Sequence, residues 1–463
     1  MTGLTDPHQP VPLTGVRCIR ATEIEQGPDS MKSAGVVVVV TVLICGVSGW
    51  AQEAGLPTAR DRSKPARVPT PRDTIPLERL KKLAARNAGA EFDPNRVITP
   101  HMPIAIRQEH PEGLRYQEGL SYTFLVHSMK FAAMCRLGDG TIVMVGTGWV
   151  DGSTSEKRSC FVSYSRDEGR TWSQPRLFHT GLERPQPVSL GGQKLLLLPM
   201  DDDGFLAFSD DGGRSFSGKR PFPRLGNKTI TYHKGSVLVE KNEVTAVFTA
   251  EVPPHGPSGW RAQSLVRRSR DGGRTWKEGY WLPAEWETSE GAIVRAADGA
   301  LVVALRTAQP PDYPSYTDHW RRLTTARSTD DGKTWTHRQV HFKYGKVHSD
   351  LIKLKDGRLL LTYAARMGEL DGMIYHGIEA VISGDHGKTW DWDKRFILFR
   401  WAMHQSMHSP CSLQLADGRI LTLFLYHYGA QWGRNTVGGA GRTLGITSAV
   451  IWSLDPQQAA SAQ

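Results

Sequence analysis

Short apolar runs alternate with turn-forming dipeptides along most of the chain. The stretch SEGAIVRAADGALVVALR, residues 289–306, shows the pattern, with one apolar run on either side of Asp298-Gly299. An Asp-Gly pair between apolar runs favours a two-stranded β-hairpin, because its turn needs residues that tolerate positive φ. The hairpin returns on itself, so the pattern predicts that Glu290 and Arg306 end at the same edge of a sheet.

Turns of this kind recur at a similar spacing. They lie at Asp139-Gly140, Gly191-Gly192, Lys241-Asn242, Asp298-Gly299, Asp356-Gly357 and Asp417-Gly418. Six spaced hairpins predict an all-β fold of six small sheets, or blades, arranged radially so that only short strand edges are exposed. The residues from Pro103 to Tyr116 are expected to supply a closing strand.

A second motif runs out of phase with the hairpins. It occurs as SRDEGRTW at Ser165, SDDGGRSF at Ser209, SRDGGRTW at Ser269, STDDGKTW at Ser328 and SGDHGKTW at Ser383, at intervals of 44, 60, 59 and 55 residues. In each copy the Asp is suited to cap the backbone amides of a tight turn, and the Gly to supply a positive φ. Repeats at this spacing indicate one four-stranded sheet per copy.

The repeated S-x-D-x-G-x-[TS]-[WF] is identified as the Asp-box of the sialidase superfamily. From about Pro103 to Leu454 the chain resembles the catalytic domain of bacterial sialidases, which implies a six-bladed β-propeller. The same resemblance implies that the Asp-boxes lie on outer turns and are structural. A shared fold says much less about the reaction than about the architecture.

In a propeller, the inner strand of each blade starts at one face and the second strand returns to that face. The polar residues expected around this rim include Lys130, Arg184, Glu290, His348, Asp350, His408 and Ser409 at the strand starts, and Asp151, Arg306, Arg366, Tyr426 and Tyr428 at the returns. Such a ring suits an acidic sugar, because the planar fork of arginine binds a carboxylate through two hydrogen bonds. The alternative is that these strand ends are polar only because they meet water.

The resemblance assigns roles to some of these residues. Glu290 and Arg306 match the fourth-blade pair of sialidases, in which the Arg binds the substrate carboxylate and the Glu polarises a nucleophilic tyrosine. Sialidases are the tyrosine exception among glycosidases. Arg366 is the candidate for a further carboxylate-binding arginine, and Asp151 for the acid/base carboxylate. Arg184, His348 and Asp350 are expected to contact the substrate.

Two positions depart from the family pattern. Lys130 stands where the family has its first carboxylate-binding arginine, so the charge is kept and the fork is lost. Ser409 stands where the family has its tyrosine. Tyr426 and Tyr428 could return a phenol to the same rim, and His408 could instead serve as a base for direct attack by water.

The histidines also raise the question of a metal. His404 and His408 are four residues apart, but no carboxylate-histidine signature accompanies them and no helical pattern places them on one face. No phosphate-binding glycine loop or serine nucleophile elbow occurs either. The sequence therefore predicts no metal and no cofactor.

The N-terminal part of the chain differs from the rest. Residues 31–51 have the short apolar run and small residues of a cleaved signal peptide, so residues 1–30 are an upstream extension or reflect a start at Met31. Residues 52–102 are a Pro-rich basic linker with one short helix over PLERLKKLAARNAG. Nine Lys or Arg lie between Arg60 and Arg86 against three acidic residues, so much of the net charge of +10 belongs to this linker.

The location of this charge argues against a nucleic-acid partner for the propeller, expected over residues 103–455 before a tail at 456–463. Cys135, Cys160 and Cys411 form no disulfide framework in the mature chain. The sequence thus predicts an exported, monomeric, exo-acting glycoside hydrolase that releases a terminal acidic sugar and has no membrane span after signal cleavage. The alternatives are a non-catalytic glycan-binding propeller and a hydrolase of neutral glycans.

Overall fold

The structure is a computed structural model. It describes residues 97–98, 102–109, 111–112, 115–124, 130–148, 159–178, 182, 184–200, 205–222, 224–226, 230–232, 235–251, 262–277, 279–307, 321–370, 373–401, 407–428 and 444–455. The chain divides into two units, Met1–Thr58 and Ala59–Gln463, and every described residue belongs to the second. The expected signal peptide, the linker before residue 97, its short helix and the tail lie outside the described residues.

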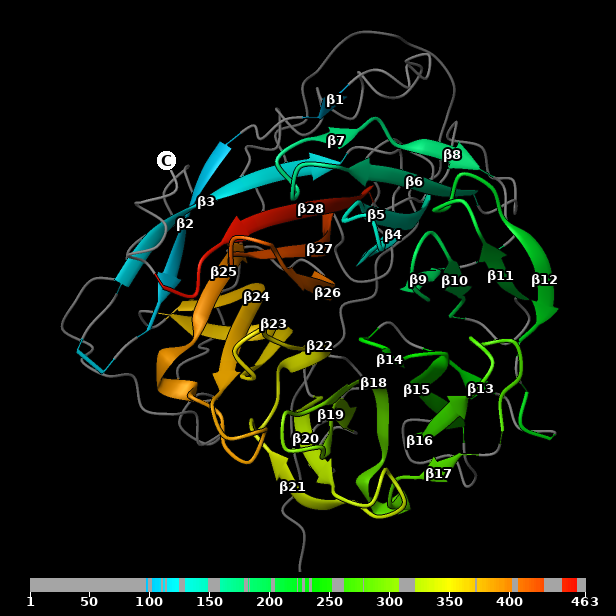
Figure 1. Ribbon diagram of the computed structural model, residues 1–463. Helices are drawn as coiled ribbons and strands as arrows, with labels where there is room; N and C mark the ends of the chain where they lie inside the picture. The colour runs from blue at the N-terminus through cyan, green and yellow to red at the C-terminus, as the bar shows by residue number, and fades with distance from the viewer. Residues whose placement is uncertain are drawn as a thin grey trace, which may run out of the picture. The chain divides into compact units, whose positions relative to one another are not determined.

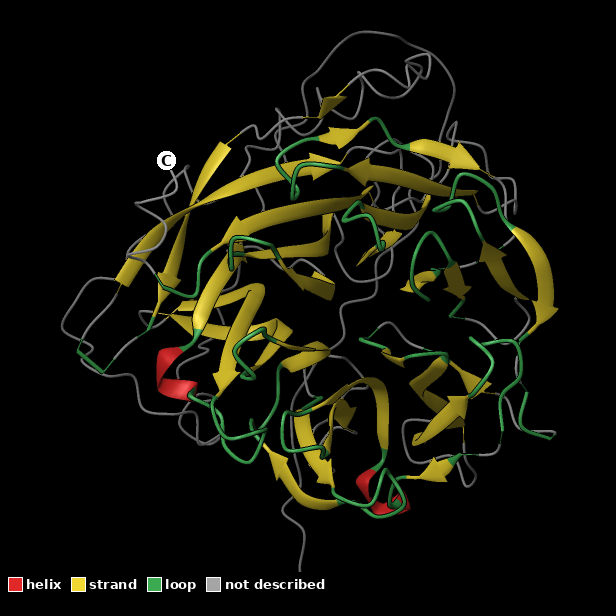
Figure 2. Cartoon of the chain, in the orientation of Figure 1, coloured by secondary structure: helices red, strands yellow, loops and turns green. Residues whose placement is uncertain are grey.

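Strands make up nearly all the regular structure of the described part (Figure 2). The helical segments there are two short 3-10 turns, η2 (Ala284–Trp286) and η4 (Trp392–Lys394). None of the helices in this part is long and apolar enough to cross a membrane. The expectation of an all-β protein is confirmed.

Four antiparallel sheets contain strands that follow one another in the chain. The first has β4 (Lys130–Arg136), β5 (Ile142–Gly148), β6 (Ser159–Ser165) and β8 (Arg176–Phe178). The second has β9 (Gln186–Ser189), β10 (Leu195–Leu198), β11 (Phe205–Ser209) and β12 (Ser217–Pro221). The third has β13 (Ile230–Thr231), β14 (Leu238–Glu240), β15 (Glu243–Glu251), β16 (Ala262–Ser269) and β17 (Tyr280–Trp281). The fourth has β18 (Thr288–Arg295), β19 (Leu301–Thr307), β20 (Leu323–Ser328) and β21 (Thr336–Val340).

The remaining long strands form one sheet of nine. In spatial order it contains β22 (Lys346–Lys353), β23 (Leu359–Leu370), β24 (Met373–Ser383), β25 (Phe396–Trp401), β2 (Met102–Gln108), β3 (Arg115–Phe124), β28 (Leu444–Trp452), β27 (Ile420–Tyr428) and β26 (Met407–Gln414). A small separate pair joins β1 (Val97–Ile98) to β7 (Trp172–Ser173). The pair β2 and β3 therefore lies between β25 and the last described strand, β28. One closing strand was expected from this region, and two strands occupy that place.

The sheets lie around a common centre, with β4, β9, β14, β18, β22 and β26 innermost (Figure 1). This is a propeller-like arrangement. Six separate blades are not confirmed, because the strands expected for the fifth and sixth share the nine-stranded sheet. The six predicted hairpins all occur, as the antiparallel pairs β4-β5, β9-β10, β14-β15, β18-β19, β22-β23 and β26-β27.

The five repeated turns share one set of hydrogen bonds. In the third, Asp271 Oδ1 accepts the backbone N–H of Thr275 at 2.8 Å, and Oδ2 accepts the Thr275 hydroxyl at 2.6 Å. The Ser269 hydroxyl donates to Asp271 and accepts the N–H of Gly273, whose φ is +86°. The turns at Ser165, Ser209, Ser328 and Ser383 repeat these contacts. The predicted capping role of the aspartate is therefore confirmed.

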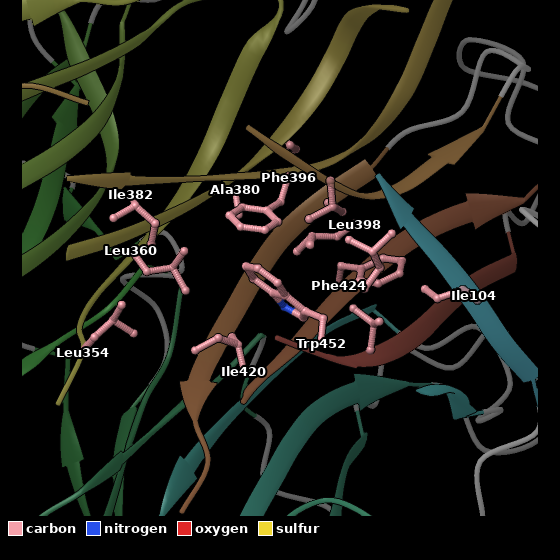
Figure 3. Close-up of a cluster of buried hydrophobic side chains, with 14 of the residues drawn as sticks. Ile104, Leu354, Leu360, Ala380, Ile382, Phe396, Leu398, Ile420, Phe424 and Trp452 are labelled. Atoms are coloured by element: carbon pink, nitrogen blue, oxygen red, sulfur yellow. The ribbon is translucent and has the colours of Figure 1, made fainter. Parts of the chain in front are cut away.

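Apolar side chains fill the layers between neighbouring sheets and within the nine-stranded sheet. One cluster gathers side chains from β2, β22 to β25, β27 and β28, among them Ile104, Leu360, Phe396, Phe424 and Trp452 (Figure 3). The Trp452 ring lies 4.9 Å from that of Phe396. Cys135, Cys160 and Cys411 are free thiols in the described part. Packing across the sheets holds the inner strands in place.

Candidate active site

The inner strands β4, β18, β22 and β26 each begin with a β-bulge, where two residues oppose one on the partner strand. In β18, Ser289 pairs with Arg306 and the next pair is Ala292 with Ala304, so Glu290 and Gly291 share one opposing residue. A bulge re-aims the side chain that it carries. In β18 the second bulge position suits glycine, because a Cβ on Gly291 would lie 2.5 Å from Val247 Cγ1.

Glu290 and Arg306 do meet, as the hairpin pattern predicted. Arg306 Nη1 lies 2.9 Å from Glu290 Oε1, and both side chains are about nine-tenths buried, with 8% of each exposed. Arg306 Nε also donates to the Ser289 hydroxyl at 3.1 Å. The backbone N–H of Glu290 donates to Thr249 Oγ1 at 3.3 Å. Contacts from its own strand and from the preceding sheet thus hold this carboxylate and its arginine.

His348 occupies the corresponding bulge of β22 and reaches the same carboxylate. Its Nδ1 lies 2.6 Å from Glu290 Oε2, and its Nε2 lies 3.1 Å from Arg366 Nη2. A guanidinium can only donate hydrogen bonds, so Nε2 is the acceptor and the imidazole is neutral, with its proton on Nδ1. Neutral His348 therefore accepts a hydrogen bond from Arg366 and lies in close contact with the Glu290 carboxylate.

These four side chains form one buried set of mixed charge. Arg306, Glu290, His348 and Arg366 are 6%, 7%, 7% and 2% exposed, respectively. Two guanidinium groups face one carboxylate and a neutral imidazole, so the set carries one excess positive charge. Arginine forks in a buried setting favour an anionic ligand.

Asp350 lies two residues beyond His348, but its carboxylate is directed to backbone groups. Its Oδ2 accepts the N–H of Ser412, on β26, at 2.6 Å. Burial raises the pKa of Asp350 to about 7, opposed by hydrogen bonds from the backbone of Ser412, Leu351 and Ser236. These contacts tie β22 to β26, at the two ends of the nine-stranded sheet, and to the segment before β14; the expected contact of Asp350 with substrate stays a prediction.

The other expected site residues fall into three groups. Arg184 lies just before β9, where its N–H donates to Thr147 Oγ1 at 2.8 Å and its Nη1 contacts Met200 Sδ at 3.0 Å. Lys130, His408, Tyr426 and Tyr428 are placed on β4, β26 and β27 by their backbone, and their side chains lie outside the description. Asp151 lies outside the described residues altogether.

The register changes one alignment. Lys130 pairs with Thr147 before the bulge of β4, so it corresponds to Ser289, and residue 131 occupies the position that Glu290 has in β18. Lys130 is thus at the strand start, as expected, and one residue before the bulge position. Residue 131 and Glu290 both lie eight positions before the aspartate of their hairpin turns, Asp139 and Asp298, so the two strands carry the bulge at the same place.

Two residues of the site have no counterpart in the sequence-based expectation. Ser289 and Thr249 place hydroxyl groups on Arg306 and on the backbone of Glu290. Ser289 is recognisable from the hairpin register, since it is paired with Arg306, but Thr249 comes from another sheet. Among the described residues, no group of three or more His, Cys, Asp or Glu side chains is arranged to hold a metal ion.

Comparison with known proteins supports the repeat and the fold. Residues 201–369 match the family described as a BNR repeat-like domain. No curated protein matches the sequence. A solved protein of unknown function from Dyadobacter fermentans is similar, with a TM-score of 0.52 and 20% identity over 70% of this chain and 95% of that one. This likeness concerns the fold alone.

Two glycosidase structures show weaker likenesses. An α-L-arabinanase of Penicillium chrysogenum has a TM-score of 0.47 at 11% identity, over 77% of this chain and 99% of that one. A Trypanosoma rangeli sialidase has a TM-score of 0.45 at 15% identity, over 77% of this chain and 57% of that one. These distant likenesses carry no argument about the activity of this chain.

Proposed function

We propose that the protein is an exo-acting glycoside hydrolase that releases a terminal acidic sugar, similar to sialic acid, from glycans. The observation that carries this proposal is the buried set Arg306, Glu290, His348 and Arg366 at the starts and returns of inner strands. The Asp-box repeats and the BNR repeat-like match support the same class. We also propose that the two halves of the nine-stranded sheet are the fifth and sixth blades of a six-bladed propeller.

In this proposal the charged groups have separate roles. Arg306 and Arg366 bind the carboxylate of the sugar, and Glu290 acts as the base. Asp151 is the acid/base carboxylate on the leaving-group side. Tyr426 or Tyr428 supplies a phenol as the nucleophile. If neither does, His408 activates water for direct attack on the anomeric carbon.

The decisive test is hydrolysis of a panel of aryl glycosides by the purified chain and by Glu290→Gln. General-base catalysis contributes about 100-fold or more, so kcat/KM should fall by at least that factor. The matched control is Glu285→Gln, which makes the same chemical change at an exposed residue of η2. Equal hydrolysis by the wild type and Glu290→Gln would refute the assigned role of Glu290.

A hydrolase of neutral glycans is the second candidate. It is favoured by the engagement of both arginines within the protein, since Arg306 contacts Glu290 and Arg366 contacts His348. In that case aryl glycosides of neutral sugars are cleaved and aryl sialosides are not. A propeller that binds glycans without turnover would cleave none of the panel.

Export is part of the proposal. The apolar segment of residues 31–51 suits a cleaved signal, so N-terminal sequencing of the exported protein should begin near Gln52. Recovery of Met1 on a membrane-retained form would contradict it.

A further inference from the structure

Nine residues other than glycine have a positive φ in the described part, and they fall into a pattern. Glu168, Asp331 and His386 occupy the same position of three repeated turns, Lys241 lies in a hairpin turn, and Glu287 ends η2. The other four are Arg184, Glu290, His348 and Ser409, with φ of +47°, +49°, +53° and +44°. All four lie at or just before the start of an innermost strand.

Three of these four occupy the same register position. Glu290, His348 and Ser409 are each the first residue of the bulge in β18, β22 and β26. A side chain with a Cβ is disfavoured at positive φ, and such strain persists where the surrounding structure imposes it. Ser409 also precedes Pro410, whose ring further restricts the residue before it.

The strands that carry this position are neighbours around the centre (Figure 1). Glu290 and His348 approach within 2.6 Å, although they belong to different sheets. On the other side of β22, strand β26 packs against β22 and β23. Ser412 N–H donates to Asp350 on β22 at 2.6 Å, and the Ser412 hydroxyl lies 2.8 Å from that of Thr362 on β23. Ser409 precedes Ser412 by three residues and His348 precedes Asp350 by two. Ser409 is therefore the neighbour of His348 around the centre.

The Ser409 hydroxyl differs from the other two side chains at this register position. The residue is 7% exposed, yet no hydrogen bond from its hydroxyl to another described residue exists. Glu290 and His348, in the same strained position, both hold charged or polar partners. Ser409 therefore combines a strained backbone, little exposure and a hydroxyl that no other described residue binds, an arrangement suited to contact with a bound ligand.

We infer that Ser409 is a ligand-contacting residue, whose hydroxyl hydrogen-bonds to a hydroxyl of a sugar bound next to His348. This inference rests on the proposed function in one respect: the ligand is assumed to be a sugar. It requires no catalysis by Ser409 itself. The bulge directs the Ser409 hydroxyl toward the sugar. The positive φ of Ser409 is the backbone strain that this orientation requires.

The experiment compares Ser409→Ala and Ser409→Gly with the wild-type chain. Binding of free sialic acid and of free L-arabinose is measured by calorimetry, and stability by the melting temperature. Loss of one hydrogen bond should weaken binding of the preferred sugar roughly three- to tenfold in both variants. Because glycine accepts positive φ without penalty, Ser409→Gly should melt no lower than Ser409→Ala.

Lys241→Gly is the matched control. Lys241 has a φ of +57° and an exposed side chain in the turn between β14 and β15. Replacing Lys241 by glycine relieves the same kind of backbone strain in this turn, and should leave sugar binding unchanged. Weakened binding in this control would show that the effect at Ser409 is a general response to glycine, and would overturn the inference.

The outcomes separate this inference from the proposed function. If no aryl glycoside is cleaved but binding depends on Ser409, the hydrolase proposal fails and the inference holds. If hydrolysis depends on Glu290 while both Ser409 variants bind as tightly as the wild type, the inference fails alone. Failure of the wild type to bind either sugar overturns the inference as well.

Discussion

Asp350 shows how a single buried carboxyl makes this protein sensitive to pH. Burial raises its pKa from 3.8 to about 7, so between these values the folded protein keeps a proton that the unfolded chain has released. The stability linked to this group is therefore present below about pH 4 and is lost as the pH rises through about 7. Above that pH the carboxyl of Asp350 is ionised in both the folded and the unfolded protein, so stability no longer changes with pH through this group.

We predict that Asp350→Asn removes this dependence. The free energy of unfolding of the wild type relative to Asp350→Asn should fall by a few kcal/mol (about 1.4 per unit of pKa shift) between about pH 4 and 8. Urea denaturation of both proteins at several pH values measures this difference in the free energy of unfolding. Asp393→Asn, at an exposed aspartate of η4, serves as the control. Parallel stability curves for wild type and Asp350→Asn would contradict the prediction.

At the scale of elements, the repeated turns stabilise the outer connections of the sheets. We predict that Asp271→Ala lowers the free energy of unfolding by about 1 to 3 kcal/mol, because the N–H and hydroxyl of Thr275 lose their acceptor. Sugar binding by the folded fraction should not change. Thermal melting and calorimetry test both parts. Asp210→Ala, at an exposed aspartate of the second turn, is the control; a loss of binding at unchanged stability would refute a structural role.

A buried ion pair connects strands within the nine-stranded sheet. Lys346 Nζ on β22 lies 2.6 Å from Glu379 Oε1 on β24, and the Tyr363 hydroxyl on β23 donates to Oε2 at 2.7 Å. Burial opposes ionisation of Glu379, but the charges of Lys346 and Arg395 outweigh it and hold its pKa at about 2. Tyr363 is fully buried, so this tyrosine-glutamate pair is closed to a sugar.

We predict that Glu379→Gln destabilises the fold by about 3 to 5 kcal/mol, because it leaves the Lys346 ammonium buried without its partner. The double variant Glu379→Gln/Lys346→Met should recover much of this loss, since no buried charge remains. Denaturant unfolding of the two variants and the wild type provides the comparison. If the double variant is no more stable than Glu379→Gln, the unpaired charge is not the cause.

At the scale of the whole β unit, the first long strands join the last. β3 pairs with β28, and β2 pairs with β25, so strands from both ends of the described chain lie in one sheet. Trp452 lies at this junction: its indole N–H donates to Thr422 Oγ1 at 3.0 Å and its ring packs on Phe396 (Figure 3). Closure therefore depends on side chains that are distant in sequence.

We predict that Trp452→Ala lowers the free energy of unfolding by about 3 to 5 kcal/mol through the cavity that it leaves. Unfolding should lose cooperativity between the strands on either side of the junction. Hydrogen exchange of β25 and β27, together with denaturant unfolding, tests this. Trp452→Phe keeps most of the packing and should lose less; an equal loss would assign the effect to the indole hydrogen bond.

The sequence by itself determined the parts of this protein that depend on near neighbours. The six hairpins and five repeated turns are made by residues a few positions apart, whose dipeptides and serine-aspartate motifs carry the required φ angles and hydrogen bonds. The meeting of Glu290 with Arg306 follows from the same local logic, since one hairpin joins them.

Only the tertiary structure decided which distant strands meet. The contact of Glu290 with His348, the hydrogen bond from Ser412 to Asp350 and the pairing within the nine-stranded sheet join residues far apart in the chain. No local pattern encodes such pairings, because they depend on which strands pack together once the chain has closed. The strand pairing also shows that residue 131, one residue after Lys130, is the equivalent of Glu290 in β4, and that Ser409 is the equivalent of His348 in β26.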